Sequence, residues 1–201
     1  MKRLSKWFYL GSIIGGPVSG IFLFTVALVI LALSGILTGY VVNLSHAETW
    51  TLATSIPLIL SGAAAMLFGL SIWYILLYRA WSVIQDGKAS TTPGKAVGFI
   101  FIPFYDFYWI FRAWWGFARD YNRYIERHAL NAQKLNEGLF LAFCILSLCN
   151  AVLSLPIPFL QDTYLVYVAG LPFLAIFIVT TNNTIDAVNS LQALQAEATN
   201  K

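Results

Sequence analysis

Charged residues are scarce in this 201-residue sequence. Only 10% of its residues are Asp, Glu, Lys or Arg, whereas 59% are hydrophobic. An ordinary globular domain has about a quarter of its residues charged. A soluble domain of this length could not cover so many apolar side chains. The composition therefore excludes an ordinary soluble fold and predicts an integral membrane protein.

Residues that carry chemistry are scarce as well. Cys144 and Cys149 are five residues apart in an apolar stretch, which places them about 140° apart around a helix and argues against a metal pair or a redox motif. The two histidines, His46 and His128, are predicted on opposite sides of the membrane. No phosphate-binding glycine loop and no hydrolase motif occurs. We therefore expect no catalytic residue, no metal site and no cofactor.

Four long runs without Asp, Glu, Lys, Arg or His predict four membrane spans. The runs cover residues 7–45, 49–78, 138–161 and 163–185, and each suffices to cross a bilayer, which takes about 20 apolar residues. In the first run, Gly15-Gly16-Pro17 is expected to separate an interfacial lead-in at 1–17 from the span itself. The predicted spans are residues 18–42, 56–78, 139–155 and 164–181.

Prolines mark the expected ends and bends of these spans. Pro57 fits the first turn of the second helix, Pro156 and Pro158 are expected to end the third, and Pro172 is expected to kink the fourth. The link at 161–163 is short. The last two spans should therefore form a tight helical hairpin.

The basic residues set the predicted orientation. All twelve Lys and Arg lie in the N-terminus, in residues 79–137 or at Lys201, and such residues collect on the cytoplasmic side of a membrane. An even number of spans places them all there, with both termini inside. Three of them precede the first run, as in a secretory signal, but that run is too long for a signal core. We interpret it as an uncleaved anchor.

The loop at residues 85–137, between the second and third spans, is dense in aromatic residues. From Phe99 to Tyr124, 13 of 26 residues are Phe, Trp or Tyr. On a helix over 104–128, one face carries four arginines and the opposite face is largely aromatic. These faces comprise Arg112, Arg119, Arg123 and Arg127, and Ile110, Trp114, Phe117, Tyr121 and Tyr124. Such a helix is expected to lie in the headgroup plane.

The predicted fold is thus an all-α integral membrane protein with four transmembrane helices and an interfacial amphipathic helix in the cytoplasmic loop. Three interpretations of that loop remain open. It can anchor the helix bundle; it can bind anionic lipid or a protein partner through its four arginines with Trp114 and Trp115; or 96–111 can form a re-entrant hairpin turning at Pro103. Acidic residues interrupt the basic face, which argues against a nucleic-acid partner.

Polar groups within the spans are mild. Asn150 is the best candidate for a polar intramembrane site, although an interhelical hydrogen bond explains it equally. Small residues at four-residue spacing, Gly35/Gly39 and Ser61/Ala65/Gly69, allow close helix approach, within the chain or between copies. The fourth span is expected to continue as a cytoplasmic helical tail over 182–201, whose apolar face packs on the loop of its own chain or on a partner.

Several segments together resemble a group of small multi-pass bacterial membrane proteins that has no established activity. They are LYRAW at 77–81, PGKAVGFIFIPFYDFYWIF at 93–111, GFARDYNRYI at 116–125 and DAVN at 186–189. The resemblance covers about residues 77–190. It implies a bacterial inner membrane and transfers no functional residue.

Three classes of function are compatible with these patterns. The favoured hypothesis is a non-enzymatic accessory subunit or scaffold that contacts anionic lipid, a protein partner or another copy of itself. The second is a small oligomeric permease or channel lined by Asn150. The third is a membrane-embedded enzyme acting on lipid, which would require an acid or base such as Asp106, Asp120 or His128.

Overall fold

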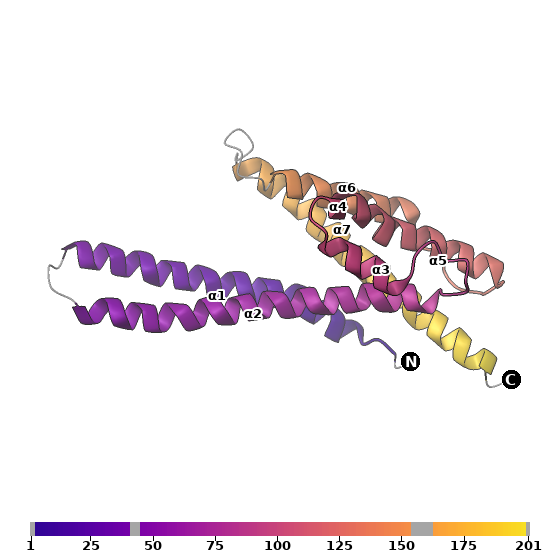
Figure 1. The fold of residues 1–201 in the computed structure, drawn as a ribbon, viewed down its shortest axis with the longest axis horizontal. Helices are drawn as coiled ribbons and strands as arrows, with labels where there is room; N and C mark the ends of the chain where they lie inside the picture. The colour runs from indigo at the N-terminus through magenta and orange to yellow at the C-terminus, as the bar shows by residue number, and fades with distance from the viewer. Residues whose placement is uncertain (1–2, 41–44, 154–162, 200–201) are drawn as a thin grey trace. The chain divides into compact units, whose positions relative to one another are not determined.

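The computed structural model describes residues 3–40, 45–153 and 163–199, and all regular structure within these ranges is helical. The chain forms two compact units. The N-terminal unit comprises Trp7–Trp73, and the C-terminal unit combines Met1–Lys6 with Tyr74–Lys201. Figure 1 shows the helices of each unit.

Helix α1 runs without interruption from Lys6 to Tyr40, and α2 runs from Ser45 to Val83. The predicted break at Gly15-Gly16-Pro17 is absent, because Pro17 lies inside α1. Pro57 likewise lies inside α2 rather than in its first turn. Helices in an apolar setting tolerate interior proline because neighbouring helices and side chains satisfy the freed backbone groups.

Glycines at four-residue spacing bring α1 and α2 together in the N-terminal unit. A Cβ atom at Gly16 would lie 2.6 Å from the Ala65 carbonyl oxygen, and one at Gly20 would lie 2.6 Å from the Gly62 carbonyl oxygen. Both distances are shorter than real contacts, so only glycine fits. Gly16 therefore packs a helix against its neighbour instead of ending one.

The predicted small-residue set on α2 is only partly at this contact. A Cβ at Gly69 would meet the Pro17 ring at 2.6 Å, and the Ala65 backbone contacts Gly16. Ser61 is exposed and returns its hydroxyl to the Leu58 carbonyl. The surroundings of Gly35 and Gly39 lie outside the described side chains.

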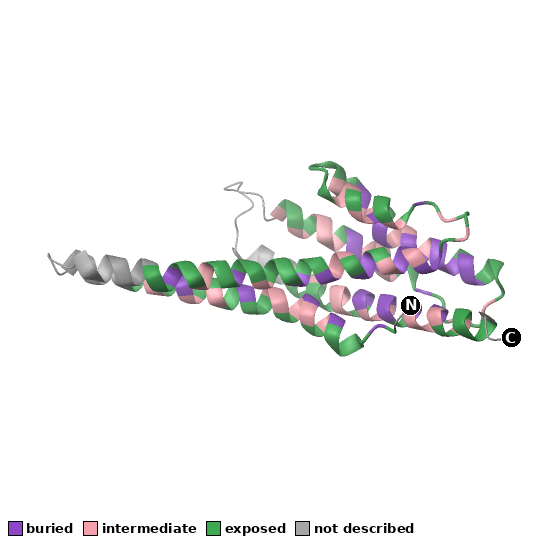
Figure 2. Ribbon diagram, turned by 60° about the horizontal axis from the view of Figure 1, so that its bottom comes forward, coloured by how far each residue is buried: buried purple, intermediate pink, exposed green. Residues whose placement is uncertain are grey.

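Among the residues that the structure describes, three helical stretches are long and apolar enough to cross a membrane: Lys6–Leu33, Ala53–Val83 and Gly170–Ala198. In the first two, large apolar side chains face outward, including Phe22 at 66% exposed and Leu67 at 64% exposed. Figure 2 shows these stretches as mostly exposed or intermediate. Water would not stabilise such a surface, and lipid does. The chain has the architecture of a helical membrane protein.

In its described residues, the C-terminal unit is built from the end of α2 and seven further elements. In chain order these are α3 Pro93–Gly98, η1 Phe99–Phe101, α4 Tyr105–Ile110, the π-helical segment η2 Phe111–Trp115, α5 Gly116–Arg127, α6 Glu137–Leu153 and α7 Thr163–Thr199. The predicted helix over 104–128 is present as the continuous series α4, η2 and α5.

Helices α6 and α7 pack through aromatic rings. Phe143 of α6 lies 5.9 Å from Phe173 and 6.0 Å from Phe177 of α7, measured between ring centroids. Within the described residues α6 has 17 residues, fewer than a complete span. The predicted end of the third span at Pro156 and Pro158 and the link at 161–163 include residues outside the described ranges.

The last part of α7 packs on its own chain, as the first of the two alternatives for the tail predicts. Ile185, Val188 and Leu191 are fully buried. The Gln195 amide donates to the Val83 carbonyl at 3.1 Å and to the Tyr124 hydroxyl at 3.1 Å. These bonds join α7 to the ends of α2 and α5.

A second face of α7 holds the N-terminal segment. The Asn189 amide accepts from the Leu4 backbone N–H at 2.7 Å and donates to the Leu4 carbonyl at 3.0 Å. Lys6 forms an ion pair with Asp186 at 2.6 Å. The polar tail residues thus fix the start of the chain rather than standing free.

Candidate functional site: the arginine row of α4, η2 and α5

The helix over residues 105–127 runs antiparallel to α6. Trp114 and Phe117 pack on Phe143 and Phe140, with ring centroids 5.7 and 6.5 Å apart, so the sequence order of the contacts is reversed. Asn122, further along, donates to the Glu137 carboxylate at 3.0 Å, at the start of α6. The site is therefore carried on a helix that stands beside an apolar helix.

A wider π turn lies in the middle of this helix, over Phe111–Trp115. The indole N–H of Trp81 donates to the Ala113 carbonyl within that turn at 2.9 Å, and the bond is buried. A π turn disturbs the regular pattern of helical hydrogen bonds, so an outside donor stabilises it. Trp81 thereby ties the end of α2 to this helix.

The aromatic face of the helix contacts protein. Trp114, Phe117 and Tyr121 are all at most 1% exposed, and Phe117 lies against the Trp81 ring with centroids 5.8 Å apart. We expected this face to meet lipid in the headgroup plane, and Trp114 to belong to a lipid- or partner-binding surface. The structure instead buries both, because α2, α6 and α7 together enclose this face.

Three of the four predicted arginines remain on the outer face. Arg112 is exposed. Arg119 lies with its guanidinium carbon 4.8 Å from the centre of the Trp115 ring, a cation–π contact. Arg123 is 57% exposed and lies 3.8 Å from the buried carboxylate of Asp120. We call Arg112, Trp115, Arg119 and Arg123 the arginine row.

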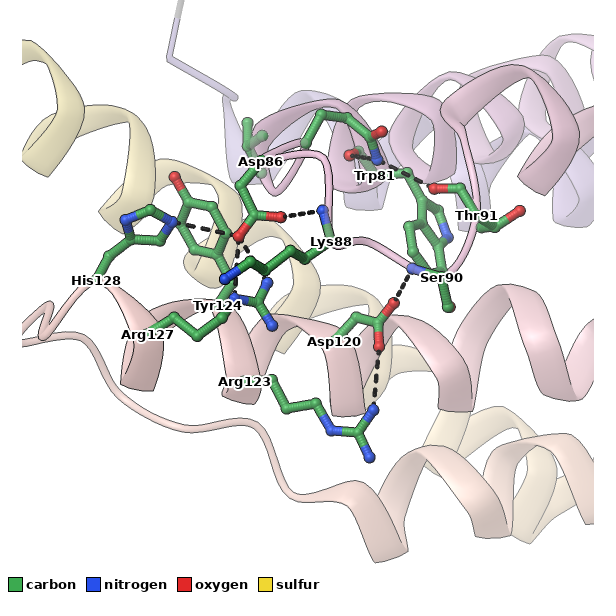
Figure 3. A network of polar contacts seen from close by, with 12 residues as sticks. Trp81, Asp86, Lys88, Ser90, Thr91, Asp120, Arg123, Tyr124, Arg127 and His128 are labelled. Carbon is green, nitrogen blue, oxygen red and sulfur yellow. Dashed lines mark hydrogen bonds and ion pairs between the residues drawn. The ribbon is translucent and has the colours of Figure 1, made fainter.

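Arg127, the fourth arginine, is turned away to a separate network, which Figure 3 shows. Its Nε and Nη2 both donate to Oδ2 of Asp86, at 3.0 and 2.7 Å. The other oxygen of Asp86 accepts from the Lys88 backbone N–H at 2.9 Å, and His128 Nε2 lies 3.3 Å from Oδ2. Arg127 therefore stabilises the turn that follows α2.

The pKa of Asp86 reflects this network. Partial burial raises the pKa, but the bonds from the Lys88 backbone, Arg127 and His128 outweigh it and lower the pKa to about 2. The carboxylate is thus charged at every physiological pH. It serves as an acceptor for Arg127 and has no proton to exchange.

The three candidate acid–base residues do not form a common site. Asp120 is buried and accepts from the Ser90 backbone N–H at 2.7 Å, which fixes the loop before α3. His128 packs against Tyr124 with the two rings tilted by 45° and their centroids 4.5 Å apart. Asp106 lies in the first turn of α4, about 20 Å along the helix from Asp120.

A polar recess of about 690 Å³ opens between the connection at 131–136 that precedes α6, residues 183–193 of α7 and Arg3. Many of its lining side chains are amides. The lining includes Asn131, Gln133, Asn136, Asn183, Asn189 and Gln192.

Asn150, the predicted intramembrane polar site, donates to the Leu146 carbonyl of its own helix at 2.9 Å. Its side-chain oxygen faces Gly170 of α7, since a Cβ there would lie 4.0 Å away. Asn150 therefore lies at the contact between α6 and α7.

Sequence reasoning did not identify the polar residues that organise this region. The side-chain oxygen of Asn122 accepts from the Leu135 backbone N–H at 2.8 Å, and its side-chain nitrogen donates to the Leu135 carbonyl at 2.9 Å. These two bonds fix the connection from α5 to α6. Asp86 and Asn189 do the same for the turn after α2 and for the N-terminus. The only available signal was their polarity beside apolar neighbours.

The fold and the site define a helical membrane protein that presents a row of arginines on a helix packed against its apolar helices. No family model, no curated protein and no solved structure matches the chain.

Proposed function

We propose that this protein is a non-enzymatic accessory subunit or scaffold of a bacterial inner membrane. In this proposal α1, α2, α6 and α7 supply four spans, and both termini and residues 79–137 lie in the cytoplasm. The charge distribution supports the orientation, because every Lys and Arg then lies on the cytoplasmic side. The resemblance of residues 77–190 to small bacterial membrane proteins supports the location.

The observation that carries the proposal is the division of the 105–127 helix into two faces. Its aromatic face is buried from Trp114 to Tyr124, whereas the arginine row faces outward. Arg119 is also preorganised by Trp115, 4.8 Å away. A row of like charges on a fixed helix suits recognition of an acidic surface.

The height of the row favours a protein over lipid as its partner. In this proposal the membrane surface lies level with Arg112, because Ala113 bonds Trp81 just past the apolar run of α2. Helix α6 then enters the membrane near Phe143, beside Trp114, rather than at the predicted residue 139. Arg119 and Arg123 stand about 10 and 16 Å further from the membrane than Arg112. These separations exceed the Debye length of about 8 Å at physiological salt. Headgroup charge is therefore largely screened at these two residues, and we infer that they dock an acidic segment of a membrane partner.

A photo-crosslinking residue at Trp115 tests this function in cells. We expect a discrete protein adduct, whose yield falls in the Arg119→Gln/Arg123→Gln variant. The Lys88→Gln/Lys134→Gln variant removes the same charge elsewhere and should leave the yield unchanged. Adducts with lipid alone, or equal loss in both variants, would contradict the proposal. An adduct of two copies of the chain would assign the row to self-association and contradict an accessory role.

A further inference from the structure

Residues 93–110 form a helical hairpin in the C-terminal unit. Thr92 caps α3, accepting the Lys95 N–H at 3.4 Å, and the Trp109 indole of α4 donates to the Ala96 carbonyl of α3 at 3.1 Å. Phe99 packs on Trp109 with ring centroids 4.7 Å apart. These contacts hold the two limbs side by side with the turn at 102–104.

The turn lies level with the apolar part of α2. Phe101, just before the turn, packs on Tyr74 of α2 with ring centroids 5.0 Å apart. Tyr74 is five residues before Arg79, the first charged residue after the apolar run, so it lies about 7.5 Å to the membrane side of that charge. The Trp81 bond to Ala113 indicates the same direction. Trp81 lies past Arg79, and α4 begins about 12 Å before Ala113 along the helix axis, on the side of Tyr74.

The side chains at the turn are apolar and point outward. Phe104 is 84% exposed and Phe101 is 63% exposed, and Ile102 and Tyr108 are exposed beside them. An exposed apolar patch of this kind marks an interaction surface.

Phe104 also adopts a backbone conformation that a bulky residue rarely takes, with φ at 64°. Glycine or asparagine would fit this position with less strain. A strained, outward phenylalanine at the apex indicates that its side chain is needed there.

Basic residues flank the apolar turn on both limbs. Lys95, at the start of α3, and Arg112, three residues after Trp109, are both exposed. Asp106 is the one charged residue between them in sequence, and it lies in the first turn of α4, where the helix dipole favours a carboxylate. An apolar tip below a pair of cations matches the polarity of one membrane leaflet, with acyl chains under phosphates.

We propose that this hairpin is re-entrant, inserting Phe101, Ile102 and Phe104 among the acyl chains of the cytoplasmic leaflet while Lys95 and Arg112 bind the phosphates of anionic lipids. The insertion is shallow. A depth of about 7–10 Å suits the boundary between headgroups and acyl chains, where Asp106 still reaches water. The inference depends on α2 crossing the membrane and is independent of the partner proposed for Arg119 and Arg123.

Spin labels in nanodiscs of phosphatidylcholine and phosphatidylglycerol test the insertion. Labels are attached at Phe104→Cys and, as a control in an exposed turn, at Lys88→Cys, both in a Cys149→Ala background. Buried Cys144 is retained, and the background without an added cysteine measures any labelling of it. We expect the label at 104 to be relaxed by oxygen and shielded from a water-soluble nickel chelate, and the label at 88 to behave oppositely.

Two results would overturn the insertion. Equal nickel accessibility at 104 and 88 would place the turn in water. Shielding of the label at 104 from both oxygen and nickel would place it against protein. Labels at Phe101→Cys provide a second test if the variant at Phe104 does not fold.

The cation pair is tested by native mass spectrometry with phosphatidylglycerol. Each basic residue near an anionic surface contributes about fivefold in affinity, so the Lys95→Gln/Arg112→Gln variant should bind this lipid roughly 25-fold more weakly. The Lys88→Gln/Lys134→Gln variant is the matched control and should bind as the parent does. Unchanged binding in the first variant, or equal loss in both, would refute the phosphate contacts.

Discussion

Replacing Gly20 of α1 by alanine tests whether close contact between α1 and α2 stabilises the N-terminal unit. A Cβ at this position would lie 2.6 Å from the Gly62 carbonyl oxygen, a backbone atom. To restore an ordinary contact of 3.4 Å the two helices must separate locally by about 0.8 Å. Overpacking of this kind costs about 1–3 kcal/mol.

Gly15→Ala provides the matched control on the same helix. A Cβ at Gly15 would meet nothing within 4 Å. Alanine gains about 1 kcal/mol over glycine in helix propensity at either position, so this gain cancels in the comparison. The difference in unfolding free energy between the two variants should therefore report the clash alone, at about 1–3 kcal/mol.

Unfolding in mixed detergent micelles, followed by circular dichroism, measures this difference. Gly62→Ala gives a reciprocal test, because its Cβ would lie 2.9 Å from the Gly20 carbonyl oxygen. Once Gly20→Ala has moved the helices apart, the second substitution should cost less than it does alone. Equal stability of the Gly20→Ala and Gly15→Ala proteins would refute the close-packing argument.

Three further predictions concern the C-terminal unit. Asp86→Asn should destabilise it by about 1–2 kcal/mol at neutral pH, because Arg127 loses its charged acceptor. The pKa of Asp86 is lowered from 3.8 to about 2. The parent protein should therefore keep this stabilisation above about pH 5 and lose it as the pH falls toward 2. If unfolding of both proteins depends on pH in the same way, this prediction is wrong. Trp81→Phe should leave the Ala113 carbonyl without its buried donor, at a cost of about 1–3 kcal/mol, and hydrogen exchange should accelerate in 105–127 but not in α1. Asn189→Leu should release the N-terminal segment, because it removes both side-chain bonds to the Leu4 backbone. We expect faster proteolysis of that segment. Unchanged proteolysis would show that the two bonds are dispensable.

The sequence was sufficient to predict helices, because long apolar runs and a 3.6-residue period have few other solutions. It was insufficient at Gly16 and Pro17, where the residues that break a soluble helix instead mediate helix packing. The four-residue spacing of Gly16 and Gly20 is a packing signal in its own right. A turn signal and a packing signal can share the same glycine, and only the neighbouring helix distinguishes them.

The outward position of Arg112, Arg119 and Arg123 was predictable, and the separate environment of Arg127 was not. The angular position of Arg127 on a regular helix matches that of the other three, but its partner Asp86 lies 41 residues earlier in sequence. Such long-range pairs leave no periodic trace. The same holds for Asn122 and Asn189, whose bonds fix connections that hydrophobic periodicity does not describe.

The aromatic residues between Phe99 and Tyr124 serve two different environments, and this division carries both proposals. A helical stripe of aromatic side chains is equally compatible with lipid and with the interior of a protein, since both are apolar. The structure separates them: Phe117 is fully buried beside Trp81, whereas Phe104 is 84% exposed at the turn. The buried group fixes the helix along α6, and in the proposed orientation this aims the arginine row away from the membrane. The exposed group is the part of the hairpin for which the proposed insertion supplies lipid as the environment.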